Sequence, residues 1–362
     1  MKVIVSGAGP SGLVAAASAI SCGHSVRVFE EHARSGSPQH CSGLISKEGL
    51  ESLSDLADYR KHVINEIRGA TFDFAGERFE IERKQETAFV IDRAGFDAEL
   101  AEKAESMGAS FIYNRRFSPE SGCAGCGAII GADGPLSGVA SYFNFPKIRS
   151  FAFTLKAKAR ISADSCQKVS LFYDNSKFPG FFAWLIPHNE SEAEIGLGTT
   201  NSESLRPGFD YLIKKLEIRK WEKPKGRIIP ISPRSRTAGE FGGRNVLLVG
   251  DAAGQVKSSS GGGVVFGTSA ARLAGKFVFE PKKYESQWRR EIGADMGAHS
   301  MLRSFFAAQP GFSLRLMSAS SKLLGLNWFF SLYGNMDRPT HMLGAFLERN
   351  KLTPAHKNAV TN

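Results

Sequence analysis

The first thirty residues constrain the fold of this chain more than any other segment. Residues 2–6 (KVIVS) form an apolar, β-branched run, which is typical of a strand buried in a parallel sheet. The glycine-rich residues 7–12 (GAGPSG) follow and open a small-residue helix at 13–20, which Gly23 ends before the second apolar run at 25–29 (SVRVF). This order predicts one complete strand–helix–strand unit of the dinucleotide-binding type.

The glycines and the acid of this unit have separate roles in holding a dinucleotide. Gly7 permits a tight turn, Gly9 lets the backbone approach a pyrophosphate, and Gly12 allows the helix to pack closely on the strand. The amides at the start of the helix, around Ser11, then face the phosphate charge. Glu30 follows the second strand, where an acid binds ribose hydroxyls and disfavours the 2′-phosphate of NADP. Together these features predict a bound dinucleotide.

A second segment far along the chain favours FAD over NAD. Residues 245–263 read NVLLVGDAAGQVKSSSGGG, a strand followed by Gly-Asp, small residues and a glycine-rich helix start. Asp251 is placed to hydrogen-bond a ribityl chain, and the amides around Gly262, Gly263 and Val264 are placed to face the pyrimidine end of an isoalloxazine. A simple NAD dehydrogenase has no use for such a segment, so FAD is the expected cofactor.

The chain is expected to form an α/β fold from four segments. Residues 1–150 form the first part of an FAD-binding Rossmann domain, and residues 236–283 complete it. Between them, residues 151–235 show alternating strands, which predict an inserted antiparallel-sheet substrate domain. Residues 284–362 read as a C-terminal helical region.

Shorter elements can be assigned inside these segments. Residues 70–74 and 78–82 are expected to pair as strands around Gly76, and residues 93–107 to form an amphipathic helix. The second cofactor segment is expected to continue into a helix that begins at Gly267.

Charge and composition limit the class of partner. Lys and Arg outnumber Asp and Glu by 46 to 36, which gives a net charge of +10 and favours an anionic partner. No helix-turn-helix, zinc-finger or RNP-type signature is present, so nucleic acid is not expected, and an acidic membrane surface is the alternative to plain solubility. The odd number of cysteines, five, argues against a disulfide framework. No apolar run is long enough to span a bilayer. The first strand begins at Lys2 and is expected to leave no room for a signal peptide. A cytoplasmic protein, free or attached to a membrane surface, is expected.

Four sequence matches connect these motifs to one family. They are SPQHCSGLIS around Cys41, IDRAGFDAELA at Arg93, GDAAGQVKSSSGGGV at Asp251, and PGFFAWLIP at residues 179–187. In this order they resemble the glutathione-reductase-type FAD fold in its aromatic-hydroxylase branch, and more narrowly the geranylgeranyl reductase family, specifically the archaeal digeranylgeranylglycerophospholipid reductases. There they correspond to a cysteine loop, an arginine-led helix, the second FAD motif and a substrate-side PxxYxWxFP motif. The resemblance covers roughly residues 1–280.

The resemblance implies reduction of isolated carbon–carbon double bonds in the geranylgeranyl chains of membrane lipids. It places Cys41, Gly43 and Arg93 beside the flavin, with Cys41 as the acid or its relay and bound water as the second candidate. Spacing alone makes Cys41 a buried small residue, and the adjacent His40 either tunes the thiol or is a solvated loop residue. Ferredoxin and reduced nicotinamide are both open as electron donors. The expected substrate-channel residues, which strand-core packing also explains, are Phe172, Tyr173, Phe181, Phe182 and Trp184.

The chain also departs from the family pattern. Phe182 and Ile186 stand where the substrate-side motif has a tyrosine and a second aromatic, so no phenol hydroxyl is available from position 182. Ser258 replaces a proline of the second FAD motif. A β-excursion between residues 111 and 128 is mostly absent, and what is left contains Cys123-Ala-Gly-Cys126. This pair is expected to fill a trimmed connection, because no second ligand pair for a metal accompanies it.

Two other classes of function are compatible with the same motifs. A flavin monooxygenase or halogenase shares the fold and both FAD motifs. Residues 184–187 (WLIP) are weakly similar to a halogenase motif, whereas the Cys41 loop is not. A flavoprotein that binds lipid or senses redox state without turnover is the second alternative, because the excursion is missing and position 182 is Phe.

Overall fold

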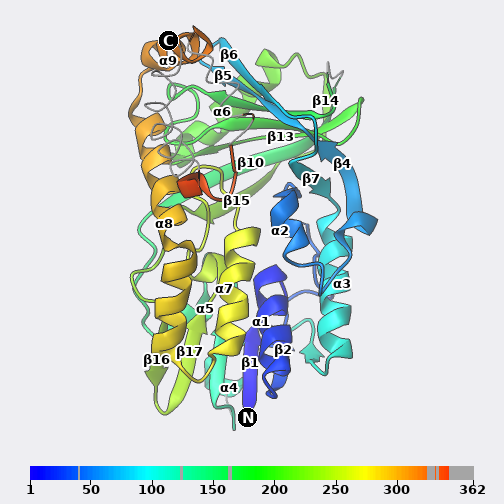
Figure 1. Cartoon of the computed structure of the whole chain (residues 1–362), viewed down its shortest axis with the longest axis vertical. Helices are drawn as coiled ribbons and strands as arrows, with labels where there is room; N and C mark the ends of the chain where they lie inside the picture. The colour runs from blue at the N-terminus through cyan, green and yellow to red at the C-terminus, as the bar shows by residue number, and fades with distance from the viewer. Residues whose placement is uncertain (40, 123–124, 162–164, 324–330, 332–333, 342–362) are drawn as a thin grey trace, which may run out of the picture.

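The sheet predicted from the first thirty residues is present, and β1 lies near its centre (Figure 1). In this computed structural model, which describes residues 1–39, 41–122, 125–161, 165–323, 331 and 334–341, the strand order is β16–β17–β9–β1–β2–β8. The strands are β1 (Lys2–Ser6), β2 (Ser25–Phe29), β8 (Ser110–Ile112), β9 (Ala128–Gly131), β16 (Ala238–Phe241) and β17 (Arg244–Leu248). All neighbours are parallel except β16 and β17. The turn after β1 therefore lies at the carboxyl edge of a parallel sheet, where ligands bind in such folds.

Both faces of this sheet are buried, as expected for a parallel sheet. Successive side chains of β1 point to opposite faces, so Val3 and Val5 join one apolar cluster while Ile4 joins another. The first face is covered by α1 (Pro10–Ser21), which packs against α7 (Val264–Lys276) and α3 (Arg93–Ser106). The continuous apolar character of the strand thus reflects burial on two sides.

The helices α1 and α7 approach each other at the backbone level. A Cβ on Gly275 would lie 2.5 Å from Cβ of Ser18 and 2.6 Å from the carbonyl oxygen of Ala15. The Ser18 hydroxyl also donates a hydrogen bond to the carbonyl of Arg272 at 2.7 Å. Two helices from opposite ends of the sequence are thereby held side by side (Figure 1). The α7 helix begins at Val264, three residues before the predicted start at Gly267. Gly267 lies inside its first turns, where a Cβ would lie 3.0 Å from the Gly250 backbone.

A second sheet lies beyond the first along the long axis of the molecule (Figure 1). Its order is β14–β10–β13–β12–β11–β5–β6, and β15 also pairs with β10. The strands are β5 (Gly69–Phe74), β6 (Glu77–Glu82), β10 (Phe151–Arg160), β11 (Lys168–Tyr173), β12 (Ala183–Pro187), β13 (Glu192–Thr199), β14 (Lys220–Trp221) and β15 (Lys225–Pro230). The predicted pairing around Gly76 is confirmed, since β5 and β6 are antiparallel neighbours.

The composition of this sheet differs from the prediction in two respects. The β5–β6 pair, expected to belong to the first cofactor-binding segment, joins the sheet built from residues 151–230, and its contact with β11 is parallel. The sheet is therefore mixed rather than purely antiparallel. An alternating strand pattern reveals which face of a hairpin is apolar but does not reveal the sheet on which that face is buried. The proposed division into four segments otherwise stays a prediction.

The remaining elements connect the two sheets and cover them. A three-stranded sheet, β3 (Leu44–Ser46), β7 (Ala88–Ile91) and β4 (Val63–Ile67), lies between them. Short elements are α2 (Lys47–Glu51), η1 (Tyr59–His62), α4 (Pro119–Gly122), α5 (Gly138–Tyr142), η2 (Ser202–Ser204), α6 (Leu205–Lys215) and η3 (Gly250–Ala252). Two C-terminal helices, α8 (Pro281–Ala308) and α9 (Gly311–Leu323), confirm the helical reading over the part of that region that is described.

The long helix α8 extends from the first sheet to the second (Figure 1). Near its start, the Tyr284 hydroxyl donates to the carbonyl of Leu248 at 2.6 Å, and Trp288 Nε1 donates to Thr237 Oγ1 at 2.8 Å. Its far end carries Phe306, whose ring lies 5.4 Å from that of Tyr173 in the second sheet. Within the described residues, no helix combines the length and the hydropathy needed to span a bilayer.

Candidate cofactor and substrate site

A single large cavity of about 1840 Å³ lies between the two sheets. The glycine-rich turn after β1, the Cys41 loop, the start of α3 and the Gly-Asp segment after β17 all contribute to its wall. The second sheet, the far half of α8, α9, residues 44–48 and the segment 334–341 also contribute to the wall. Two motifs from opposite ends of the sequence thus open into one space together with the predicted substrate motif.

The glycine-rich turn forms a cradle that side chains would fill. Gly7 has a φ of +103°, and a Cβ there would overlap the carbonyl of Ala132. A Cβ on Gly12 would overlap the carbonyl of Gly7, whereas a Cβ on Gly9 meets no protein atom within 4 Å and Gly9 lines the cavity. No side chain caps α1, which has Pro10 at its start, so its first amides are free to meet an anion. These features fit the pyrophosphate of a dinucleotide.

Glu30 lies at the cavity wall, where its carboxylate also organises the turn. Its Oε2 accepts a hydrogen bond from the Ala8 amide at 2.8 Å, and its Oε1 accepts one from the His32 amide at 2.9 Å. The Nδ1 atom of His32 lies 2.7 Å from Oε1. Ribose binding by Glu30 stays a prediction, and the structure adds that this carboxylate holds the loop in place.

Ser11 lies at the junction of the two cofactor motifs. Its hydroxyl oxygen would be 2.6 Å from a Cβ on Gly250 and 2.5 Å from a Cβ on Gly267. Gly250 also has a φ of +60°, a conformation that favours glycine. The small residues of both segments are therefore required where the loop after β17 meets the start of α1.

The carboxylate of Asp251 faces the same cavity. Its Oδ1 lies 2.9 Å from the position of a Cβ on Gly263, at the start of α7. Burial raises the pKa of Asp251 to about 6, and the positive charge of Arg93 opposes this rise. A desolvated carboxylate on a cavity wall is suited to accept hydrogen bonds from hydroxyl groups of a ligand, which fits the ribityl chain of FAD.

The predicted residues of the second motif lie together at the start of α7. Gly262, Gly263 and Val264 all line the cavity, and Val264 is the first residue of the helix. Gly263 precedes it without any side chain that caps the helix. The amides of this first turn are therefore available to a polar group of a ligand.

Cys41 and Arg93 are brought into contact with one another. The Cys41 sulfur accepts a long hydrogen bond from the Gly43 amide, with 3.5 Å between the two atoms. Gly43 has a φ of +79°, and a Cβ there would overlap the Ile91 carbonyl. Although burial works against the charge of Arg93, the Asp97 carboxylate and then the Cys41 sulfur raise the pKa of its guanidinium above the usual value. His40, the neighbour of Cys41 in the sequence, lies outside the described residues.

Asp97 is a residue of this site that the sequence analysis missed. Arg93 Nε donates to its Oδ1 at 3.0 Å, and Arg93 Nη2 donates to its Oδ2 at 2.8 Å. Both side chains are buried. The spacing of four residues along a helix was the signal in the sequence, because such pairs lie on one face.

The far half of the cavity has aromatic walls. The ring of Phe182 lies 4.6 Å from Phe181, 5.4 Å from Tyr173 and 5.9 Å from Trp184. All four line the cavity, so the predicted substrate residues are gathered in one place. Phe172, also expected at the channel, is instead packed in the core on the opposite face of the sheet, because alternate residues of a strand point to opposite sides.

Two rings of this chamber come from elements that the substrate motif did not include. Phe74 on β5 stacks on Tyr173 at 5.2 Å, and Phe306 on α8 lies 5.8 Å from Phe74. On β13, Gly196 and Gly198 make room for aromatic rings, since a Cβ on Gly196 would lie 2.5 Å from Trp184 Cζ2. The chamber is thus assembled from two parts of the second sheet and the long helix.

A buried ion pair lies beside Trp184 in the wall of the aromatic chamber. Lys156 Nζ lies 2.6 Å from Glu194 Oε2, and Trp184 Nε1 donates to Glu194 Oε1 at 3.2 Å. These polar groups fix the indole of Trp184 through hydrogen bonding.

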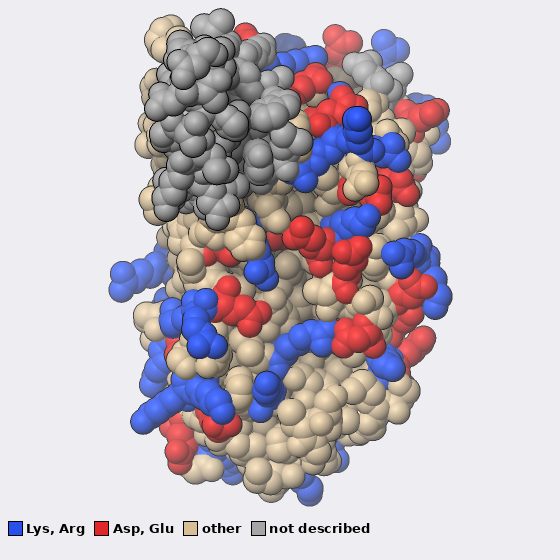
Figure 2. Space-filling model, in the orientation of Figure 1, with Lys and Arg blue, Asp and Glu red and all other residues tan. Residues whose placement is uncertain are grey.

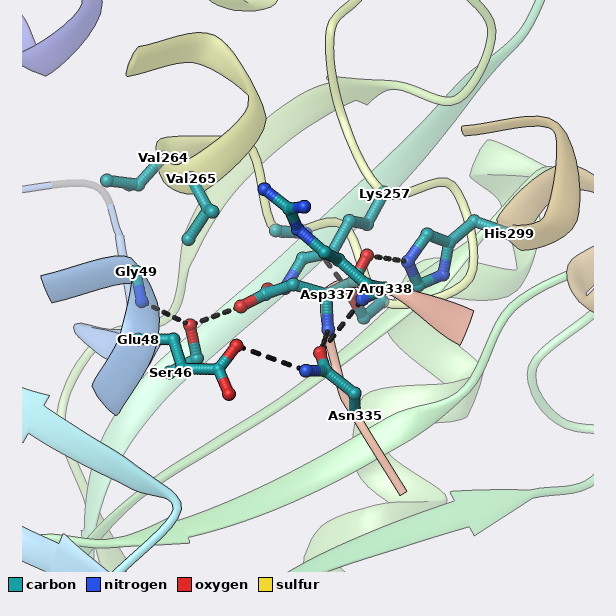
Figure 3. Close-up of polar contacts among 12 residues, drawn as sticks. Ser46, Glu48, Gly49, Lys257, Val264, Val265, His299, Asn335, Asp337 and Arg338 are labelled. Atoms are coloured by element: carbon teal, nitrogen blue, oxygen red, sulfur yellow. Dashed lines mark hydrogen bonds and ion pairs between the residues drawn. The ribbon is translucent and has the colours of Figure 1, made fainter. Parts of the chain in front are cut away.

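A second polar cluster surrounds Asp337 (Figure 3). Asp337 accepts hydrogen bonds from the Ser46 hydroxyl and from Lys257 Nζ, the latter at 2.5 Å. His299 Nε2 lies 3.1 Å from the carbonyl of Asp337, and its Nδ1 lies 2.7 Å from the Ser259 hydroxyl. Burial lowers the pKa of His299 to about 4, which leaves the ring neutral near pH 7. Lys257, Ser259 and Ser46 belong to sequence motifs quoted above, but no pattern in the sequence indicated that they meet His299 and Asp337.

The cysteine pair of the trimmed connection can be described only in part. Cys123 lies outside the described residues, and Cys126 is buried in an apolar cluster. Over the part of the chain that is described, no three His, Cys, Asp or Glu side chains gather as ligands for a metal ion.

Comparison with known proteins connects this architecture to one group of enzymes. The chain is 28% identical to the digeranylgeranylglycerophospholipid reductase of Methanothrix thermoacetophila over 351 residues, which covers 84% of this chain and 87% of the relative. It is 29% identical to the protein of the same name from Methanocella arvoryzae over 316 residues, or 76% of each chain. No protein-family model matches the chain.

Solved structures share the fold at lower sequence identity. A geranylgeranyl bacteriochlorophyll reductase-like protein from Thermoplasma acidophilum superimposes with a TM-score of 0.76 over 96% of each chain, at 20% identity. A p-nitrophenol 4-monooxygenase from Pseudomonas putida gives a TM-score of 0.68 over 97% of each chain, at 15% identity. The flavin-dependent halogenase CmlS gives 0.64 over 93% of this chain and 72% of its own, at 16% identity. By sequence the chain is therefore related to the digeranylgeranylglycerophospholipid reductases, which confirms the predicted resemblance to the geranylgeranyl reductase family, and by fold it is an α/β protein of the type that flavin-dependent oxidoreductases share.

Proposed function

We propose that this chain is an FAD-dependent reductase, of the glutathione-reductase-type fold, that saturates isolated carbon–carbon double bonds in the geranylgeranyl chains of isoprenoid glycerophospholipids. The observation that carries the proposal is the continuity of one cavity, which joins the glycine cradle and Asp251 to the aromatic chamber around Phe182. The relatives named for this lipid substrate cover more than three quarters of the chain. A cofactor site and a hydrocarbon site in one cavity are what such a reaction needs.

The residues of the cavity fit FAD. The amides after Gly9 would hold the pyrophosphate, Glu30 the adenosine ribose and Asp251 the ribityl chain. The first turn of α7 at Val264 would face the pyrimidine end of the ring system. When bound and reduced, FAD supplies the hydride for the reaction.

The chemistry of an isolated alkene determines what the protein must add. No carbonyl group is present to stabilise a carbanion, so proton delivery must lead or accompany hydride transfer. Cys41 would hold that proton in its thiol, because it lines the cavity beside the cofactor segments. The guanidinium of Arg93 lies against the sulfur and would stabilise the negative charge left on it. A water bound at the same place is the alternative acid.

The aromatic chamber would orient the chain and exclude water. Phe74, Phe181, Phe182 and Phe306 present apolar surface without a polar atom that needs a partner. Burial raises the pKa of the Tyr173 hydroxyl, so this group is neutral and contributes no charge to the chamber. Fixed geometry and low water content both favour transfer to an unactivated double bond.

We also propose that the enzyme meets its lipid at a membrane surface. Exposed apolar side chains follow the end of α8 and the adjacent α9, namely Met301, Phe305, Phe312 and Leu316. Met301 and Phe305 also line the cavity, so this surface adjoins its wall. The face shown in Figure 2 carries basic and acidic side chains intermixed. Contact through α8 and α9 would bury the exposed apolar side chains in the membrane interface.

A flavin monooxygenase or halogenase is the second candidate, because solved proteins of those classes have the same fold. One anaerobic experiment separates the candidates. The purified protein is loaded with FAD, reduced with dithionite and mixed with geranylgeranyl glycerophospholipid, while flavin absorbance is followed and the lipid is analysed by mass spectrometry. Reoxidation with a gain of two daltons per reduced bond supports the reductase. A flavin that stays reduced until oxygen is admitted and then yields an oxygenated or halogenated product supports an oxygenase or halogenase. Reoxidation by oxygen that leaves the lipid and every added substrate unchanged supports a non-catalytic role.

A further inference from the structure

Lys257 is buried at the edge of the cofactor segment. It belongs to the second FAD motif, and both its side chain and that of its partner Asp337 are only 4% exposed. The residue lines the cavity, whereas Asp337, whose carboxylate pairs with the Lys257 ammonium, does not. Figure 3 shows Ser46 and Lys257 approaching Asp337 from different sides.

The local backbone brings this ammonium to the start of α7. The Lys257 amide donates to the Gly262 carbonyl at 3.0 Å, and the Gly261 amide donates to the Lys257 carbonyl at 2.8 Å. Because of this closed turn, Lys257 Nζ lies 3.2 Å from the position of a Cβ on Gly262. Gly262 and the helix start that follows it also line the cavity. The ammonium and the uncapped first turn of α7 therefore face the same part of the cavity.

The electrostatics of this arrangement favour an anion in the cavity. The positive end of the α7 dipole and the ammonium of Lys257 lie close together, and like charges repel. The Asp337 carboxylate accepts a hydrogen bond from the Lys257 ammonium and neutralises part of its charge, and the Ser46 hydroxyl donates to the same carboxylate. His299, which contacts the Asp337 backbone, is neutral near pH 7. The Lys257 ammonium and the start of α7 therefore supply positive charge to this part of the cavity, where the Asp251 carboxylate, 2.9 Å from a Cβ on Gly263, is the opposing charge.

We propose that Lys257 is a positioning residue for redox chemistry. Its ammonium stabilises the negative charge that a bound flavin gains at its pyrimidine end when it takes up two electrons and one proton, and Asp337 moderates this effect. The inference rests on the proposed function, since it requires FAD with its pyrimidine end at the start of α7. It adds that Asp337, which lies 80 positions after Lys257 in the C-terminal segment 334–341, adjusts the reduction potential of the flavin.

A purely structural role for the ion pair predicts a different result. If Lys257 and Asp337 only hold the C-terminal segment in place, removing either charge loosens the same contact and has the same sign of effect. In the electrostatic role the two charges act oppositely, because one attracts the reduced flavin and the other repels it. The sign of the change therefore separates the two roles.

The test measures the flavin midpoint potential at a fixed pH in the FAD-loaded full-length protein. Lys257→Met should reduce the preference for reduced over oxidised FAD about tenfold, which corresponds to a midpoint lower by ~30 mV for a two-electron couple. Lys257→Arg should retain most of the wild-type potential, because it keeps the charge. Asp337→Asn should move the midpoint upward. Lys283→Met, on an exposed lysine that does not line the cavity, is the control and should cause no change.

Each outcome has a defined meaning. Wild-type protein that folds but binds no FAD contradicts the proposed function and, with it, this inference. Protein that binds FAD, with Lys257→Met and Asp337→Asn shifting the midpoint in the same direction or not at all, overturns the inference alone. If Lys257→Met does not fold, Lys257→Gln takes its place with the same expected sign, and midpoints for Lys257→Arg and Lys257→Gln that do not differ also overturn it.

Discussion

The guanidinium of Arg93 forms two hydrogen bonds to the carboxylate of Asp97, at 3.0 Å and 2.8 Å, within a buried helix start. The same guanidinium contacts the sulfur of Cys41 and lies near Asp251. One cation therefore links the Cys41 loop, the arginine-led helix and the second cofactor motif. Its geometry leads to the first prediction.

Arg93→Met should destabilise the apoprotein by about 3–5 kcal/mol, because it leaves the buried carboxylate of Asp97 without its cation. Arg206→Met is a matched control, since Arg206 and Asp210 have the same spacing on α6 but are largely exposed. The free energy of unfolding from urea denaturation should change by less than about 1 kcal/mol in this control. Equal losses in the two variants would contradict the role given to burial.

Gly9→Ala should separate cofactor binding from folding. A Cβ at this position meets no protein atom but enters the cavity, so stability should be unchanged while the affinity for FAD falls at least about tenfold, or ~1.4 kcal/mol. Gly12→Ala should lower both quantities, because its Cβ overlaps the Gly7 carbonyl.

Equilibrium titration with FAD and thermal denaturation of the apoprotein measure the two effects. Gly297→Ala is the control, because it also meets no atom within 4 Å and lies on α8 outside the cavity wall. Unchanged FAD affinity in Gly9→Ala would show that the pyrophosphate binds elsewhere.

Cys41→Ser should retain FAD but reduce lipid-dependent reoxidation of the flavin by about 10²–10⁴-fold, the usual contribution of a positioned acid. Cys22→Ser, at an exposed cysteine that does not line the cavity, should keep the wild-type rate. Stopped-flow absorbance under anaerobic conditions measures both. A Cys41→Ser variant with the wild-type rate would assign the proton to bound water.

The pKa of Asp251 predicts a dependence of apoprotein stability on pH. Burial raises this pKa to about 6 from the usual 3.8, so in that window the folded state holds more protons than the unfolded state. The contribution of Asp251 to the free energy of unfolding should therefore fall as the pH rises from 3.8 to about 6. Asp251→Asn should reduce this slope, and Asp210→Asn on the exposed face of α6 should leave it unchanged. Urea denaturation across the window tests this, and identical slopes in all three proteins would refute it.

Membrane contact through α9 predicts that Phe312→Ser combined with Leu316→Ser reduces co-flotation with anionic vesicles. These side chains are 77% and 57% exposed, so their loss should leave the fold intact. Wild-type protein that does not float with vesicles, or a double variant that floats equally well, would argue against this surface.

Local sequence patterns determined the cofactor half of this protein. The strand at residues 2–6 is followed by glycines, and the segment at 245–263 also contains them. At these glycines a positive φ or a close approach of the backbone leaves no room for a side chain, so the residue type itself indicates the local geometry. The order of these segments was enough to predict that the distant Gly-Asp segment belongs to the same cofactor-binding domain as the first glycine-rich turn.

Only the tertiary structure decided which side chains complete the site. The pairing of β5 with β11 brings Phe74 to the substrate chamber, and α8 brings Phe306 to the same place. The pairing of Lys257 with Asp337 likewise depends on the placement of segment 334–341 beside the second FAD motif. None of these contacts can be read from the sequence. The local pattern of apolar and charged residues is the same whichever distant segment they pack against. Burial and partner choice arise from the packing of distant segments, so they became visible only when those segments were placed together.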